Sequence, residues 1–131
     1  MKTIAPLIAL ALTFGAAGRA VAAPPTSGIP ALSCTIGPAS KVFGGRTWLV
    51  YGCNDGRSVV VVSGPGNPAM PFYFIFTYGP KGMELHGEGT GNKQATDAAF
   101  KELKALSQAD VAALFQQAEV HAASRSVIRR R

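Results

Sequence analysis

The hydrophobic pattern of this 131-residue chain changes its period once, near residue 92. Before that point, short strand-favouring runs are separated by clusters of Gly, Pro, Asn and Asp, as is typical of β-strands joined by turns. After it, apolar residues recur every three or four positions, as they do on one face of an α-helix. A run of strands followed by a run of helices predicts an α+β fold.

The first part of this pattern predicts an antiparallel meander. Asn54-Asp55-Gly56 is a hairpin turn signal, residues 64–68 form a longer break rich in Gly and Pro, and residues 79–82 turn the chain again. Short connections of this kind join neighbouring antiparallel strands. We expect four strands, at residues 47–51, 58–63, 72–78 and 83–88.

The second part predicts two helices. Asn92 is a suitable N-cap for the first, and Ser107 to Asp110 resembles a capping box that opens the second. Because the two helices are nearly contiguous, we expect them to cover one face of the sheet together. Their apolar positions are Ala95, Ala99, Leu103 and Leu106 in the first helix and Val111, Leu114, Phe115 and Ala118 in the second.

The N-terminus has the pattern of a secretory signal peptide. Lys2 provides a positive start, Ile4 to Phe14 is almost entirely apolar, and Ala20-Val21-Ala22 places small residues where signal peptidase requires them. The apolar run is too short to anchor the chain across a bilayer. We therefore expect residues 1–22 to be cleaved after Ala22, and the protein to be periplasmic or secreted.

The rest of the chain divides into three segments. We expect an extended lead-in rich in Pro and Gly at residues 23–40, a single α+β domain at residues 41–123, and a basic tail at residues 124–131. The net charge of +6 comes from the signal peptide and the tail, because residues 23–124 hold equal numbers of basic and acidic side chains. This distribution gives no basic face for nucleic acid. The tail predicts weak contact with an anionic membrane or polysaccharide.

The two cysteines, Cys34 and Cys53, lie in the part of the chain that would be exported. An even pair in an oxidising compartment predicts a disulfide bond. A bond across the 18 intervening residues would stabilise the fold by about 3 kcal/mol in the chain-entropy model.

One candidate chemical site lies on the fourth expected strand. Glu84, His86 and Glu88 alternate with apolar residues and glycine, so their side chains point to one face. Two carboxylates and an imidazole are metal ligands, and they would suit a small metal-dependent hydrolase or a metal-binding protein. The same alternation is also typical of a strand with one solvated face. The chain carries no nucleophile motif and no cofactor motif, so catalysis is the minority interpretation.

The glycine-rich segment at residues 87–91 leads from this strand to the first helix. Its backbone N–H groups and the helix N-terminus could bind an anion. The alternative is a tight turn that folds the helix back over the sheet. The Gly-Lys-Ser/Thr spacing of a phosphate-binding loop is absent.

The second candidate site is an apolar sheet face. Aromatic and aliphatic residues occur on both faces of the expected strands, whereas two helices can cover only one. The other face is either covered by residues 24–43 or available to an envelope protein, a second copy of the chain, or an apolar ligand. We expect Trp48, Tyr51, Tyr73 and Ile75 to border the contact surface, although strand alternation places Trp48 and Tyr51 on opposite faces and the four need not share one face.

Two short sequences, Asn67 to Phe72 and Gly87 to Gly91, occur together with the cysteine pair and the signal peptide. In these features the chain resembles small exported proteins of Gram-negative bacteria. That group carries no assigned activity, so the resemblance implies a periplasmic location and no catalytic residues. From the sequence we expect an exported, non-catalytic binding or interaction module.

Overall fold

The computed structural model describes residue 15 and residues 31–129. Apart from residue 15, the predicted signal peptide lies outside the described residues, as do its cleavage position after Ala22 and residues 23–30 of the predicted lead-in. None of the helices in the described part of the chain has both the length and the apolar character needed to cross a membrane.

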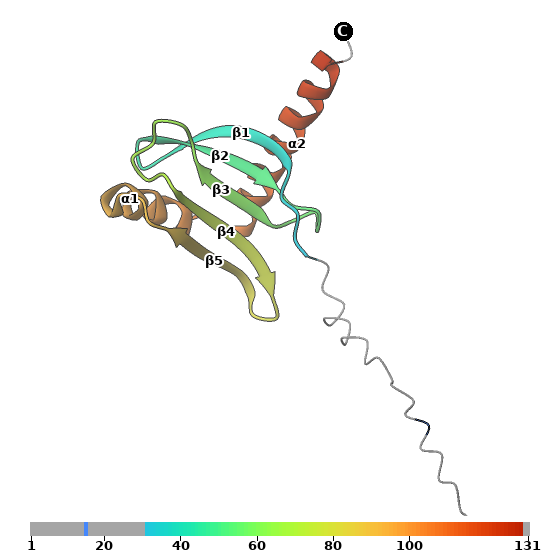
Figure 1. Cartoon of the computed structure of the whole chain (residues 1–131), viewed down its shortest axis with the longest axis horizontal. Coiled ribbons are helices and arrows are strands. Elements are labelled where there is room, and N and C mark those ends of the chain that lie inside the picture. Colours follow the sequence, from blue (N-terminus) through green and yellow to red (C-terminus); the bar gives the residue numbers. More distant parts are fainter. Residues whose placement is uncertain (1–14, 16–30, 130–131) are drawn as a thin grey trace, which may run out of the picture. The chain divides into compact units, whose positions relative to one another are not determined.

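The described residues form one antiparallel sheet followed by two helices (Figure 1). Each strand pairs with the next one along the chain, in the order β1-β2-β3-β4-β5. The predicted α+β meander with two C-terminal helices is therefore confirmed, although the sheet has five strands rather than four. The elements are β1 (Ile36–Phe43), β2 (Arg46–Gly52), β3 (Val59–Ser63), β4 (Phe72–Gly79), β5 (Gly82–Gly89), α1 (Lys93–Lys104) and α2 (Gln108–Arg129).

The additional strand, β1, includes residues that the sequence assigned to the lead-in. Residues 36–40 pair with β2, with an irregularity in the register between Ile36 and Ala39. Gly37, Pro38 and Ser40 are poor strand formers, and the backbone of Gly37 has a φ of 138°. The pairing thus depends on the neighbouring strand and not on local propensity, and the domain begins before residue 41.

The C-terminal boundary also differs from the prediction. Helix α2 continues to Arg129, so residues 124–129 of the predicted basic tail are helical. Residues 130–131 lie outside the described part.

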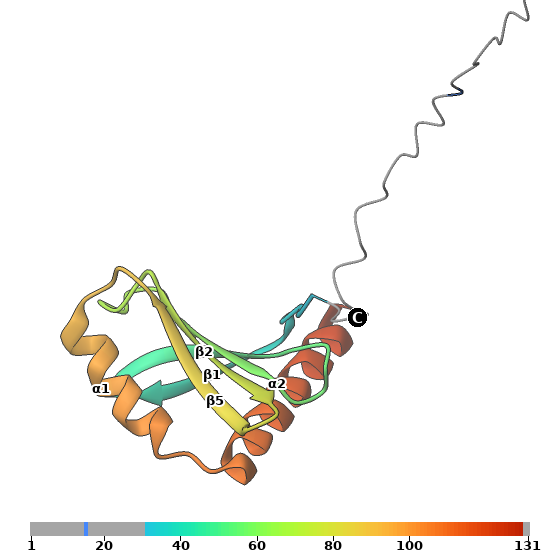
Figure 2. The same ribbon diagram turned by 90° about the horizontal axis from the view of Figure 1, so that it is seen from below.

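The core lies between the sheet and the two helices (Figure 2). Alternate side chains of each strand point toward the helices, and Trp48 on β2 is completely buried among them. Its indole ring lies 5.3 Å from the ring of Phe74, and its Nε1–H donates a hydrogen bond of 3.1 Å to the Phe43 carbonyl. Burial of each large apolar side chain stabilises the fold by roughly 1.5–3 kcal/mol.

Both helices begin at the predicted caps. The Asn92 side chain accepts a hydrogen bond of 3.1 Å from the Ala95 N–H at the start of α1. At the start of α2, Asp110 accepts a bond of 2.9 Å from the Ser107 N–H, and Ser107 Oγ accepts one of 3.1 Å from the Asp110 N–H. This reciprocal pair is the expected capping box. The hydrogen bonds from Ser107 lower the pKa of Asp110 below its usual value.

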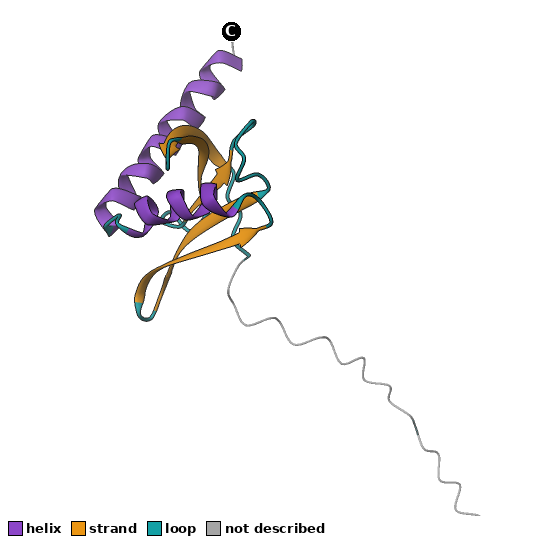
Figure 3. Ribbon diagram, turned by 90° about the vertical axis from the view of Figure 1, so that its left-hand side faces the viewer, coloured by secondary structure: helices purple, strands orange, loops and turns teal. Residues whose placement is uncertain are grey.

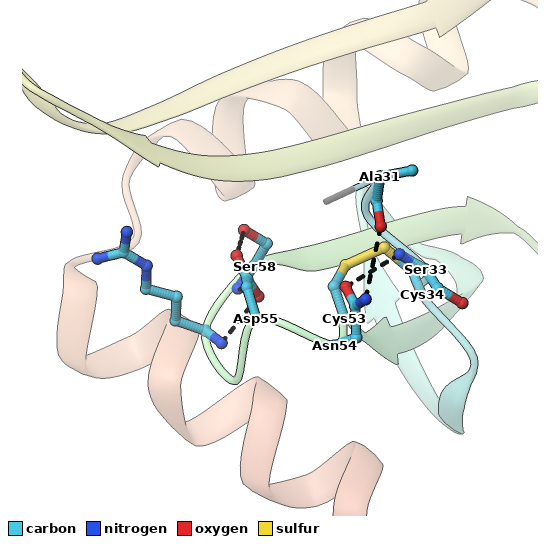
Figure 4. The surroundings of a disulfide bond; sticks show 8 residues. Ala31, Ser33, Cys34, Cys53, Asn54, Asp55 and Ser58 are labelled. Atoms are coloured by element: carbon cyan, nitrogen blue, oxygen red, sulfur yellow. Dashed lines mark hydrogen bonds between the residues drawn. A yellow bond between two sulfur atoms is a disulfide. The ribbon is translucent and has the colours of Figure 1, made fainter. Parts of the chain in front are cut away.

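The predicted disulfide bond between Cys34 and Cys53 is formed (Figure 4). It joins the segment before β1 to the residue that follows β2. Asn54 strengthens the same junction, because its N–H donates to the Ser33 carbonyl at 2.8 Å and its Oδ1 accepts from the Ser33 N–H at 3.0 Å. The disulfide and these bonds hold the start of edge strand β1 against the β2–β3 connection.

The joint replacement of Cys34→Ala and Cys53→Ala should lower the free energy of unfolding by about 3 kcal/mol, because the unfolded chain regains the entropy of an open loop. Urea denaturation of the oxidised protein and of the double variant measures the difference. A reducing agent should destabilise the parent protein to a similar degree and leave the variant unchanged. Equal stability of the two oxidised proteins would contradict this role of the bond.

Candidate functional site

The sheet face opposite the helices, called here the open face, carries no covering segment among residues 31–129. Of the predicted cover, residues 36–43 form edge strand β1 within the sheet, and residues 24–30 lie outside the described part. Residues 36–43 are therefore part of the sheet and do not cover this face. From the strand register, the open face consists of Ser40, Val42, Thr47, Leu49, Tyr51, Val60, Val62, Tyr73, Ile75, Thr77, Glu84, His86 and Glu88.

At one end of the open face, the two short sequence motifs meet. Residues 67–72 lead into β4, and residues 87–91 lead out of β5. The Thr90 N–H donates to the Pro71 carbonyl, and the Asn92 N–H donates to the Pro68 carbonyl, both at 3.0 Å. The two motifs are thus joined through their backbones.

Buried Asn67 holds the loop between β3 and β4 in place. Its Nδ2 donates a hydrogen bond of 2.9 Å to the Thr47 carbonyl, and its Oδ1 accepts one of 2.9 Å from the Ala69 N–H. One side chain therefore fixes the loop to β2 and also shapes the turn that follows it.

A hollow of about 640 Å³ lies between this loop and the open face. Its volume is within the range of about 300–1,000 Å³ that is usual for small-ligand sites. Most of its surface is apolar, and the Met70 and Tyr73 side chains at its border are 55% and 39% exposed. The lining residues are Val60, Val62, Ser63, Met70, Pro71, Phe72, Tyr73, Glu88, Gly89 and Thr90.

One polar pair borders the hollow. The Tyr73 hydroxyl donates a hydrogen bond of 2.9 Å to Glu88 Oε2 on the neighbouring strand. This hydrogen bond, together with the negative charge of Glu88, raises the pKa of Tyr73 above its usual value, because both favour the protonated hydroxyl. The pair fixes the position of the Tyr73 ring at the edge of the apolar surface.

The four residues predicted at the border of a contact surface do not share one face. Tyr51, Tyr73 and Ile75 lie on the open face, and Tyr73 lines the hollow. Trp48 is paired with Lys41 on the opposite face and is completely buried under the helices. Its inclusion among the contact residues is therefore corrected, because the helices cover the side to which it points.

The predicted metal ligands share the open face but do not converge on one point. His86 Nε2 lies 3.3 Å from Glu84 Oε2, and both side chains are exposed. The Glu88 carboxylate instead binds the Tyr73 hydroxyl. Among residues 31–129, no three His, Cys, Asp or Glu side chains lie close enough together to hold a metal ion. The geometry gives the hydrolase alternative no support.

The glycines of residues 87–91 allow two segments to approach closely. A Cβ atom at Gly91 would overlap the Ala69 carbonyl oxygen, and one at Gly89 would overlap the Pro71 carbonyl oxygen. These contacts favour the tight-turn interpretation over an anion-binding loop. Sequence analysis did not identify Val60, Val62 or Met70 as site residues, since only the meeting of the two motifs brings them around one hollow.

Comparisons of the chain with protein-family models, with curated proteins and with solved structures gave no match.

Gly91→Ala should lower the free energy of unfolding by about 1–3 kcal/mol, because the added methyl group forces the two loops apart. Gly79→Ala is the matched control, since a Cβ atom there meets no other atom within 4 Å. Thermal and urea denaturation of both variants provide the measurement. If the two substitutions lower the free energy of unfolding by the same amount, the loops do not pack as described.

Replacement of Glu88 should change the titration of Tyr73. In Glu88→Gln, the pKa of Tyr73 should fall toward the unperturbed value of about 10, because the negative charge is lost. NMR spectra of ring-labelled tyrosine, recorded as a function of pH, follow the midpoint. Glu84→Gln removes a charge from the same strand without removing the partner of Tyr73, and the midpoint should remain where it is in the parent protein.

Proposed function

We propose that this chain is an exported, non-catalytic binding module, and that the hollow on the open face receives an apolar side chain or segment of an envelope protein. The observation that carries the proposal is an apolar hollow with exposed Met70 and Tyr73 at its border. Exposed aromatic residues and methionine beside an apolar depression are typical of protein contact surfaces.

Three features support the exported location. The N-terminal sequence has the three parts of a signal peptide, the Cys34–Cys53 disulfide suits an oxidising compartment, and the chain resembles small exported Gram-negative proteins. In this proposal the compartment is the periplasm or the extracellular space.

The chemistry of the hollow favours binding over catalysis. Its two titratable lining residues, Tyr73 and Glu88, are hydrogen-bonded to each other and not to a nucleophile. The hydroxyl of Ser63 accepts a bond of 3.3 Å from the Phe72 N–H and therefore serves the backbone. A site for nucleophilic catalysis would need a base placed against a nucleophile, and this pairing is not found among the lining residues.

Affinity capture from envelope extract tests the proposal. The oxidised protein lacking residues 1–22 serves as bait, beside a double variant with Met70→Ser and Tyr73→Ser. A defined protein should bind the parent at moderate salt and lose at least about tenfold in affinity for the double variant. Leu32→Ser is the matched control, because it removes an exposed apolar side chain that does not line the hollow.

Two results would contradict this function. One is equal capture by the parent and the double variant, and the other is the absence of any specific protein. Capture that disappears with salt, or with deletion of residues 124–131, would instead indicate electrostatic attachment of the basic segment to anionic membrane or polysaccharide.

A further inference from the structure

The C-terminal part of α2 extends beyond the sheet. The first half of the helix packs on β1 and β2 through Val111, Phe115 and Ala118, all of which are buried. Residues 119–129, called here the overhang, continue past the edge of the sheet (Figures 1 and 3). Apart from half-buried Ala122, their side chains are exposed, and the single hydrogen bond to the sheet runs from Arg125 to the Gly37 carbonyl at 3.5 Å.

The overhang carries apolar side chains on its outer side. Val120, Val127 and Ile128 are 64%, 57% and 73% exposed. Val120 and Val127 lie two turns apart on one face, because seven residues correspond to about two helical turns. Val120 follows buried Ala118 by about 200° around the helix axis, so this apolar face is turned away from the sheet on which α2 packs.

The charges of the overhang and of the open face are opposite. The overhang contains one acidic residue, Glu119, at its start and two arginines, Arg125 and Arg129, toward its end, and the sequence continues with Arg130 and Arg131. The open face carries two carboxylates, on Glu84 and Glu88, together with His86, and none of its strand residues is lysine or arginine. The C-terminal part of the overhang therefore combines exposed apolar groups with positive charge, and the open face combines apolar groups with negative charge.

We propose that the overhang of one copy of this chain docks on the open face of a second copy. Val127 and Ile128 enter the hollow beside Met70 and Tyr73, and the arginines lie against the acidic side chains of β5. This inference rests on the proposed function, because it uses the same binding surface and names a second copy of the chain as an occupant.

The docked overhang must come from another molecule. Within one chain, α2 is a continuous helix whose first half is fixed against the covered face of the sheet. Its end cannot reach the open face on the other side of the same sheet. Since the two docking surfaces differ, a reciprocal contact closes a dimer, whereas a one-way contact adds further copies in series.

Sedimentation velocity of the oxidised protein lacking residues 1–22, over a range of concentrations, tests the proposal. The expected result is reversible association to a dimer or to a concentration-dependent series. Val127→Asp should weaken association at least about tenfold, because it places a charge in the apolar contact. Asp97→Lys, on the exposed surface of α1, is the control and should leave association unchanged.

Charge reversal tests the orientation of the contact. A variant with Glu84→Lys and Glu88→Lys, and a second with Arg129→Glu, Arg130→Glu and Arg131→Glu, should each lose association. Mixing the two variants should restore it, because each then offers the surface that the other needs. Circular dichroism confirms that both variants are folded, so loss of association cannot reflect unfolding.

A protein that stays monomeric at every concentration, or that associates equally well after Val127→Asp, overturns the proposal. Monomeric protein that sediments with phosphatidylglycerol vesicles through the overhang would assign this helix to a lipid surface instead. Capture of an envelope protein by Val127→Asp distinguishes the two ideas. If sedimentation shows no self-association but capture by this variant persists and still depends on Met70 and Tyr73, the proposed binding function stands while the proposal of self-association is overturned.

Discussion

Helices α1 and α2 cover the same face of the five-stranded sheet, because only residues 105–107 connect them and leave no length for a crossover. The buried alternate residues of the strands, with Trp48 and Phe74 at the centre, supply one side of a single core. The capping box at Ser107 and Asp110 sets where the second helix starts. Within residues 31–129, the helices cover only one face, so the apolar side chains on the opposite face have no helix above them.

The hollow on that face is made by loops that are themselves rigidly connected. Asn67 ties the β3–β4 loop to β2, and the absence of a side chain at Gly91 lets the segment after β5 lie directly against Ala69. The rim is therefore supported by the Asn67 side-chain hydrogen bond to β2 and by backbone contacts between the β3–β4 loop and the segment after β5. A surface held in this way is preorganised, so less conformational entropy is lost when a partner binds.

The sequence predicted the order of elements and the helix caps, because these depend on neighbouring residues. It predicted the disulfide because the chain has two cysteines. The sequence did not predict β1, because Gly37 and Pro38 are poor strand formers. This strand forms through its pairing with β2. Alternation separated Trp48 from Tyr51, but it could not say which side the helices would cover. The hollow was beyond local analysis, because residues 67–72 and 87–91 meet only after the β3–β4–β5 hairpins form.

The acidic residues of β5 also affect whether this strand can pair with the same strand of another molecule. β5 is an edge strand, and unpaired edges invite pairing with strands of other molecules. In an antiparallel pair of two β5 strands centred on His86, Glu84 would face Glu88 of the other copy, and like charges directly opposite each other are unfavourable. In the proposed contact between two copies, the same carboxylates that disfavour edge-to-edge pairing would attract the basic, partly apolar overhang to the adjoining face. On this proposal, the charge on β5 would favour contact through the open face over pairing at the sheet edge, and the apolar hollow would supply the surface buried in that contact.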